Sequence, residues 1–320
     1  MIRQDGSAAR GWMALGVAIT AVLWGCGGGD AGEAGSAESG MRVADVGFMT
    51  PESILMDTAA DVYLVSNING GPTEEDNNGF ISRVTPDGTV ENLRWIDGAA
   101  GLFPLHAPKG MAISGDTLFV ADITCIRMFN RTSGEFLSDL CLEGTSFLND
   151  VAIGPEGSIF VTDTGMRAGA AGLEPAGTDA IYRLPRGEGL RGATLARDAE
   201  LGGPNGIAIG SRGIFVVTFG SGEVLRFTAG GEKSVLLPAS NRQYDGIIFL
   251  NDGSFMFSAW GDSSIYMVGS TGSVQRVIRN VEAPADIGYD SRRNRVLIPL
   301  FNQNAIVIHD LGQAATTTGM

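Results

Sequence analysis

The chain has 320 residues, of which 44% are hydrophobic and 18% are charged, so it is long and apolar enough for a large folded core and is not a disordered chain. The 47 glycines follow no three-residue period, which excludes collagen, and together with many short apolar runs they indicate tight turns between short strands. The formal net charge of −14 repels phosphate backbones, so we expect no nucleic-acid partner.

Residues 1–26 have the pattern of a lipoprotein-type signal peptide. Arg3 and Arg10 precede an apolar run over residues 11–25, which is short for a membrane-spanning helix. The run ends in LWGC at Cys26, which resembles a bacterial lipobox, in which the cysteine is lipidated and becomes the new N-terminus. The tryptophan is bulkier than the usual residue there. The alternative is an ordinary signal peptide with an incidental cysteine.

Residues 27–41 are rich in Gly, Ser and Ala and predict a flexible tether. Gly27 stands where an Asp would indicate retention at the inner membrane. We therefore expect a lipoprotein of the cell envelope that faces the periplasm or the surface, with the outer membrane as the favoured location. We also expect the protein to be monomeric. Its lipid anchor would be its only contact with the membrane. Residues 312–320 are expected to form a C-terminal tail.

The region 42–311 repeats one pattern six times: a polar residue, a small residue, a short apolar strand, a turn and a second apolar strand. The copies begin at Glu52, Lys109, Asn149, Asn205, Asp245 and Ala285. Several copies lie about 40 residues apart, which is typical of four-stranded propeller blades. The sequence therefore predicts an all-β, six-bladed β-propeller. A β-sandwich would not explain six copies in phase.

Three features complete the predicted propeller. Insertions at residues 67–78 and 165–178 fall between the second and third strands of their blades. The last blade has only three strands after Ala285, so residues 42–48 are expected to supply its outer strand and close the ring. Cys125 and Cys141 flank a hairpin turn at near-equal distances, which places them within reach of a disulfide; two buried free thiols are the alternative.

The first residue of each repeat is expected to point to one mouth of the central channel. Carboxylate and amide oxygens therefore converge there from Glu52, Asn149, Asn205 and Asp245, with Asp150 and Asp286 at the next position. Such hard oxygen donors suit Ca²⁺ better than softer transition metals. The alternative is turn capping, because Asn-Gly and Asp-Gly often mark turns.

These positions resemble the gluconolactonase, regucalcin and strictosidine-synthase-like group of propellers, also described as SMP-30/gluconolactonase-like, with short NHL-like repeats. The resemblance covers roughly residues 42–310. It implies that Glu52 in Pro-Glu-Ser, Asn149 in Leu-Asn-Asp, Asn205 in Pro-Asn-Gly and Asp245 in Tyr-Asp-Gly hold a catalytic divalent cation, Ca²⁺ by preference.

The resemblance implies a metal-dependent hydrolase of a small lactone or ester. The cation would polarise the carbonyl, and Asp150 or Asp286 would activate water. Lys109 departs from the pattern, because paraoxonase-like enzymes carry a His there. Its ammonium group would compete with the cation, pair with Asp150 or Asp286, bind a substrate oxygen, or act as a base.

Loops around the same mouth carry the expected substrate-binding residues, namely His106, Asn67, Trp260, Phe301 and Asn302. Amides and aromatics around a polar floor suit a sugar-derived or other oxygen-rich molecule. Packing between blades is the alternative for the aromatics. A different class of function also stays open: a non-catalytic propeller, anchored in the envelope, that binds a small molecule or a protein. A bound cation with an open coordination position would separate the two.

Overall fold

The computed structural model describes residues 35–36, 40–184 and 193–312, which belong to one compact unit. The predicted signal peptide, lipidated Cys26 and most of the tether lie outside the described residues, as does the tail from residue 313. Within the described ranges, no helix is both long enough and apolar enough to cross a membrane.

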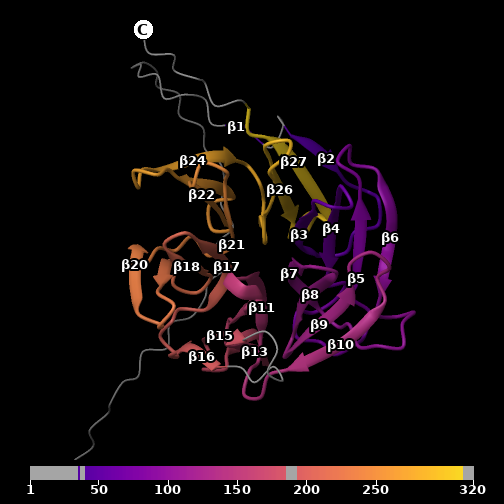
Figure 1. Cartoon of the computed structure of the whole chain (residues 1–320), viewed down its shortest axis with the longest axis horizontal. Helices are drawn as coiled ribbons and strands as arrows, with labels where there is room; N and C mark the ends of the chain where they lie inside the picture. Colours follow the sequence, from indigo (N-terminus) through magenta and orange to yellow (C-terminus); the bar gives the residue numbers. More distant parts are fainter. Residues whose placement is uncertain (1–34, 37–39, 185–192, 313–320) are drawn as a thin grey trace, which may run out of the picture. The chain divides into compact units, whose positions relative to one another are not determined.

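Six of the seven sheets formed by the described residues are arranged around a centre, which confirms the predicted six-bladed β-propeller (Figure 1). Blade one is β3 (Pro51–Asp57), β4 (Val62–Asn67), β5 (Phe80–Val84) and β6 (Val90–Asp97); blade two is β7 (Pro108–Ser114), β8 (Thr117–Asp122), β9 (Cys125–Asn130) and β10 (Phe136–Cys141); blade three is β11 (Leu148–Ile153), β12 (Ile159–Asp163), β15 (Ala180–Leu184) and β16 (Ala193–Arg197). Blade four is β17 (Pro204–Gly210), β18 (Gly213–Thr218), β19 (Val224–Phe227) and β20 (Lys233–Leu237); blade five is β21 (Tyr244–Phe249), β22 (Phe255–Ala259), β23 (Ser264–Val268) and β24 (Val274–Arg279); blade six is β25 (Gly288–Asp290), β26 (Arg295–Leu300), β27 (Ala305–Asp310) and β2 (Met41–Val43).

The core lies between the blades. The second strands β4 and β12 are buried at every position, because both faces of a blade pack against its neighbours. The outer strands β10 and β20 have no fully buried residue. Six apolar clusters result, and each joins two successive blades; the cluster of blades two and three, for example, brings Phe119 against Tyr182. This packing holds the first strands around the axis.

The N-terminal segment closes the ring as predicted. β2 pairs antiparallel with β27, with Met41 opposite Ile308 and Val43 opposite Ile306. The strand is shorter than the expected residues 42–48, because Asp45 and Gly47 adopt positive φ angles of 58° and 98°, which end the extended conformation. Further toward the N-terminus, β1 (Gly35–Ser36) pairs in parallel with β24 in blade five.

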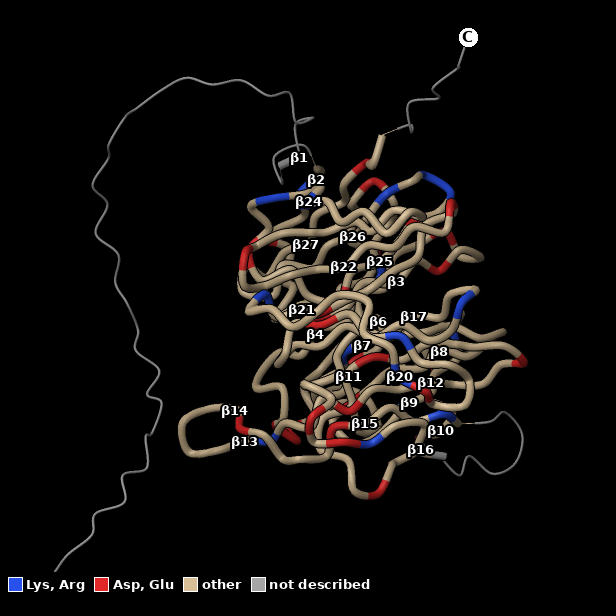
Figure 2. The backbone as a smooth tube through the Cα atoms, turned by 90° about the vertical axis from the view of Figure 1, so that its left-hand side faces the viewer, with Lys and Arg blue, Asp and Glu red and all other residues tan. Residues whose placement is uncertain are grey.

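Both insertions and the cysteine pair lie where they were predicted. The first insertion joins β4 to β5, and the second forms a hairpin of β13 (Met166–Gly169) and β14 (Gly172–Pro175) that projects from its blade (Figure 2). Cys125 and Cys141 lie directly opposite each other in β9 and β10 and form a disulfide with an S–S distance of 2.00 Å.

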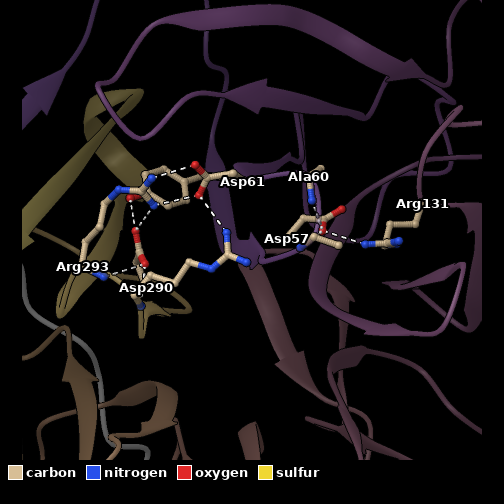
Figure 3. Close-up of polar contacts among 9 residues, drawn as sticks. Asp57, Ala60, Asp61, Arg131, Asp290 and Arg293 are labelled. Atoms are coloured by element: carbon tan, nitrogen blue, oxygen red, sulfur yellow. Dashed lines mark hydrogen bonds and ion pairs between the residues drawn. The ribbon is translucent and has the colours of Figure 1, made fainter.

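An ionic network joins blade six to blade one at the end of the channel away from the ring positions (Figure 3). Arg293 donates to both carboxylate oxygens of Asp61, at 2.8 and 2.7 Å, and to Asp290 at 3.1 Å. Asp290 is fully buried and also accepts a hydrogen bond from the Tyr63 hydroxyl at 2.8 Å. The closing seam of the propeller is therefore held by side chains as well as by strand pairing.

We expect Arg293→Ala to lower the free energy of unfolding by about 2 kcal/mol, because it removes the cation that compensates buried Asp290. Arg292→Ala is the matched control: that side chain is 53% exposed and contacts only Asp61, at 3.5 Å, so its removal should change stability by less than about 0.5 kcal/mol. Urea unfolding of both variants measures the difference. Equal effects would contradict this account of the seam.

Candidate metal centre in the central channel

A β-bulge places the ring residues in five of the six blades. In blade three, Leu148 pairs with Asp163 and Val151 with Val161, so Asn149 and Asp150 together oppose only Thr162. The same shift in register occurs at the start of the first strand in blades one, two, four and five. A bulge reorients side chains and increases local twist, which explains why the repeat turns its first residue into the channel each time.

The four predicted cation ligands share one property: each has a buried oxygen with no hydrogen-bond donor. These atoms are Glu52 Oε2, Asn149 Oδ1, Asn205 Oδ1 and Asp245 Oδ1. Their residues are between 3% and 5% exposed. Buried acceptors are nearly always satisfied in folded proteins, so four unsatisfied oxygens at one site indicate a missing electropositive partner.

Neighbouring side chains orient these oxygens. The Thr164 hydroxyl accepts a hydrogen bond from Asn149 Nδ2 at 3.0 Å and donates to the Pro204 carbonyl at 2.7 Å. Because the amide nitrogen of Asn149 is held there, its oxygen is left for another partner. The indole N–H of Trp260 lies close enough to Asp245 to oppose the rise in the pKa of that carboxyl, yet it makes no hydrogen bond of acceptable geometry.

Four buried carboxyl groups repel one another at this site. Burial raises the pKa values of Glu52, Asp150 and Asp245 well above their usual range, and repulsion from neighbouring carboxylates raises each of them further. Burial also raises the pKa of Asp286 to about 7, although a hydrogen bond from Ser53 opposes this rise. The ring therefore favours either bound protons or a bound cation.

Asp150 and Asp286 also connect blades. Asp150 Oδ2 accepts from the Ile207 amide of blade four at 2.8 Å, and its Oδ1 accepts from the Val151 amide at 2.6 Å. Asp286 Oδ2 accepts from the Ser53 hydroxyl of blade one at 2.5 Å. Both aspartates border a channel cavity of about 290 Å³ that none of the four candidate ligands lines. They thus lie deeper along the axis than the ligand oxygens.

The ammonium group of Lys109 is held by a backbone carbonyl and an aromatic ring. Its Nζ donates to the Ala107 carbonyl at 3.0 Å and lies 4.5 Å from the centre of the Phe147 ring. No ion pair in the described part of the chain includes it, so the contacts of the described residues do not support the alternative in which it pairs with Asp150 or Asp286. Burial lowers its pKa to about 8, and the charges of Asp122 and Glu52 oppose this change.

The expected substrate-binding residues separate into two groups. Asn67 is fully buried: its Oδ1 accepts from Met49 N, and its Nδ2 donates to Val65 O and Ser82 Oγ. The side chain therefore stabilises a loop and does not face a ligand, contrary to the expectation from the sequence. His106 is half-buried, and its Nδ1 accepts from the Asn77 amide at 3.1 Å. Trp260 and Phe301 are half-buried and Asn302 is exposed, so these three remain available at the mouth.

A second ring lies at the mouth, and the sequence reasoning missed its register. The residue that follows the second strand of each blade takes the same place: Ile68, Ile123, Thr164, Phe219, Trp260 and Phe301. In five blades its amide donates to the carbonyl two residues before the ring residue, as in Trp260 N to Gln243 O and Phe301 N to Ala283 O. The signal was present in the repeats, because this residue follows the second strand in every copy.

The donor set fits a hard divalent cation. The ring offers two carboxylates, which can balance two positive charges, and two amide oxygens, which are ligands that Ca²⁺ accepts. Among the described residues, no group of three or more His, Cys, Asp or Glu side chains is arranged for a metal. The candidate centre therefore depends on the amides of Asn149 and Asn205 as much as on the carboxylates.

Comparison with known proteins supports the fold. No family model matches the chain, and no curated protein matches its sequence. A gluconolactonase from Xanthomonas campestris superposes with a TM-score of 0.63 at 18% identity, covering 82% of this chain and 86% of that chain. Regucalcin from Agrobacterium tumefaciens, described as a calcium-binding protein, gives 0.56 at 16%, covering 80% and 84%. Virginiamycin B lyase from Staphylococcus aureus gives 0.59 at 16%, covering 84% and 98%. These likenesses agree with the sequence resemblance at the level of the fold.

The raised carboxyl pKa values predict how stability depends on pH in the presence of a chelator. A group whose pKa is raised by folding binds more protons in the folded state, so its contribution is present at low pH and is lost as pH rises through the folded pKa. We expect the free energy of unfolding to fall by at least about 2 kcal/mol between pH 5 and pH 7.5. His309, whose pKa is lowered by burial, acts in the opposite sense below pH 6.5.

Urea unfolding across this pH range measures the effect. Asp286→Asn should flatten the pH dependence, because it removes a group that titrates at about 7. Asp116→Asn, at a side chain that is 86% exposed, should leave the dependence unchanged. Stability that rises steadily from pH 5 to pH 7.5 would contradict the mutual repulsion described here.

Proposed function

We propose that the central ring binds a divalent cation, Ca²⁺ by preference, and that the protein hydrolyses a small lactone or ester. The observation that carries this proposal is the set of four unsatisfied buried oxygens on Glu52, Asn149, Asn205 and Asp245. The fold shared with a gluconolactonase and with a calcium-binding regucalcin supports it. When bound, such a cation acts as a Lewis acid toward a carbonyl oxygen.

The chain's own residues provide the remaining requirements. Glu52 and Asp245 compensate the positive charge, and Thr164 holds the Asn149 amide so that its oxygen faces the ring. The half-buried side chains of Trp260 and Phe301 at the mouth restrict water around a bound substrate. We therefore assign binding and orientation of the substrate carbonyl to the mouth residues Trp260 and Phe301. Compensation of the cation's charge is assigned to Glu52 and Asp245 in the ring.

Of the two candidate bases, Asp286 fits better than Asp150. Both oxygens of Asp150 accept backbone N–H groups, which commits its carboxylate to the seam between blades three and four. Asp286 uses only Oδ2 in the hydrogen bonds found among the described residues. We assign Asp286 the role of accepting a proton from water.

Two other functions have weaker support. A non-catalytic binding propeller is favoured by Lys109, whose buried ammonium group stands at the ring position of blade two. A lyase reaction is raised by the fold of virginiamycin B lyase, a solved variant of which is described as inactive after substitution of a histidine. This chain has two histidines, and neither His106 nor His309 is a ring residue. A hydrolase with a bound cation accounts for more of the ring residues than a binding propeller or a lyase does.

We expect calcium titration by calorimetry, after dialysis against chelator, to show one saturable site at neutral pH. Asp245→Asn keeps the shape of the side chain but removes a ligand charge, so it should weaken binding about tenfold or more. Asp116→Asn, at an 86% exposed aspartate outside the ring, is the control and should bind as the unaltered protein does. Absence of binding in a folded protein would overturn the metal centre and favour the binding propeller.

Turnover of a panel of small lactones and aryl esters then separates an enzyme from a calcium-binding scaffold. Asp286→Asn should reduce kcat about 100-fold or more while calcium affinity stays within a fewfold of its original value. Calcium binding without turnover of any lactone or ester in the panel would contradict the hydrolase proposal.

We also propose that the protein is a lipoprotein of the cell envelope, with Cys26 as the lipidated residue. The disulfide between Cys125 and Cys141 supports an oxidising compartment. Metabolic labelling with a palmitate analogue should label the unaltered protein and leave Cys26→Ala unlabelled and in the soluble fraction. Label retained by Cys26→Ala, or no label on either protein, would contradict the anchor.

A further inference from the structure

The mouth above the oxygen ring contains a buried donor that makes no hydrogen bond of acceptable geometry among the described residues. Trp260 Nε1 is buried and has no hydrogen-bond partner, and it lies near Asp245, whose Oδ1 is equally without a partner. A buried N–H group without an acceptor is rare and destabilising. An N–H donor without an acceptor defines a place for a carbonyl oxygen of a ligand, whereas Asp245 Oδ1 is assigned to the proposed cation.

Aromatic side chains surround this place on one side of the mouth. The Phe219 and Trp260 ring centres lie 5.3 Å apart in an edge-to-face arrangement, and those of Trp260 and Phe301 lie 5.1 Å apart. The three residues hold equivalent positions in blades four, five and six, and all are half-buried. They form a continuous aromatic wall, which we call the aromatic rim. All three side chains are partly exposed, so a ligand at the mouth can contact them.

The polar side chains of the surrounding loops are used within the protein. Asn77 accepts from the Leu105 amide at 2.7 Å and donates to the Gly98 carbonyl at 2.9 Å. Asn69 donates to the Asn78 carbonyl at 2.9 Å, and Asn304 accepts from the Thr50 amide at 2.8 Å. Together with buried Asn67, these amides hold loops in place. These four amides are therefore not free to bind a ligand.

We propose that the aromatic rim selects ligands that carry an aryl or other flat apolar substituent beside a carbonyl, and that Trp260 donates a hydrogen bond to a ligand oxygen. This inference rests on the proposed lactone or ester hydrolase. It replaces the sugar-derived ligand expected from the sequence with an aryl-substituted lactone or ester. Trp260 is the residue that determines specificity, because it offers both the donor and the central ring of the rim.

Desolvation explains the direction of the preference. Each hydroxyl of a polyol must give up its hydrogen bonds to water at the mouth, and the rim supplies a single N–H group in exchange. An aryl substituent has no hydrogen bonds to water to lose. Its apolar surface leaves water and gains edge or face contacts with Phe219, Trp260 and Phe301. The difference should therefore be large enough to measure as an affinity ratio.

Two neutral lactams that resist hydrolysis test the proposal without turnover: a phenyl-substituted γ-lactam and gluconolactam. Binding is followed by calorimetry and by acrylamide quenching of tryptophan fluorescence, with and without calcium. We expect the phenyl lactam to bind about tenfold or more tightly than gluconolactam and to shield Trp260 from the quencher. Equal or tighter binding of gluconolactam overturns the proposal.

Variants assign the effect to residues. Trp260→Phe keeps the ring but removes the donor and should weaken the phenyl lactam about fivefold. Phe301→Ala should weaken the phenyl lactam and leave gluconolactam unchanged. Trp95→Phe, in β6 away from the mouth, is the control and should change neither affinity. If Trp260→Phe and Phe301→Ala bind both lactams as the unaltered protein does, the rim is not the site.

The outcomes distinguish this inference from the proposed function. Calcium binding together with a preference for gluconolactam overturns the inference and leaves the hydrolase intact. Shielding of Trp260 by the phenyl lactam without any calcium binding supports the rim and overturns the metal centre.

Discussion

Repulsion among four buried carboxyl groups is the constraint on which the centre of this propeller depends. Burial raises the pKa values of all four groups, and repulsion from neighbouring carboxylates raises those of Glu52, Asp150 and Asp245 further. The fold compensates Asp150 with backbone amides and Asp286 with the Ser53 hydroxyl. It leaves one oxygen of Glu52 and one of Asp245 without a donor. At neutral pH these oxygens require protons or a cation, and the uncharged amide oxygens beside them favour the cation.

Repetition of one local device produces this arrangement. A bulge at the start of the first strand turns one residue to the axis in five of the six blades, and the residue after the second strand forms a further ring above it. The first ring carries the oxygen atoms proposed as metal ligands, whereas three positions of the second ring carry aromatic side chains. The same aspartates that contribute charge also tie neighbouring blades together. The same residues therefore serve the proposed metal centre and the contacts between blades. A substitution that alters one will also alter the other.

The sequence predicted those features that are repeated. Six copies in phase were sufficient to place the blades, the four oxygen donors and the closing strand, because a repeated bulge keeps its phase along the chain. The directions of loop side chains were not predictable in this way. Asn67 was expected to face a ligand, yet loop closure buries it. The partners of Lys109 come from the loops that carry Ala107 and Phe147, and a repeat pattern contains no information about them.

The most direct test of the central claim is a crystal structure of the protein grown with calcium, with the metal identified by its anomalous scattering. The account predicts one cation on the axis, about 2.3–2.6 Å from Glu52 Oε2, Asn149 Oδ1, Asn205 Oδ1 and Asp245 Oδ1, with at least one further position open toward Trp260. A ring without anomalous density, in which Lys109 Nζ contacts Glu52 or Asp245 directly, would contradict it.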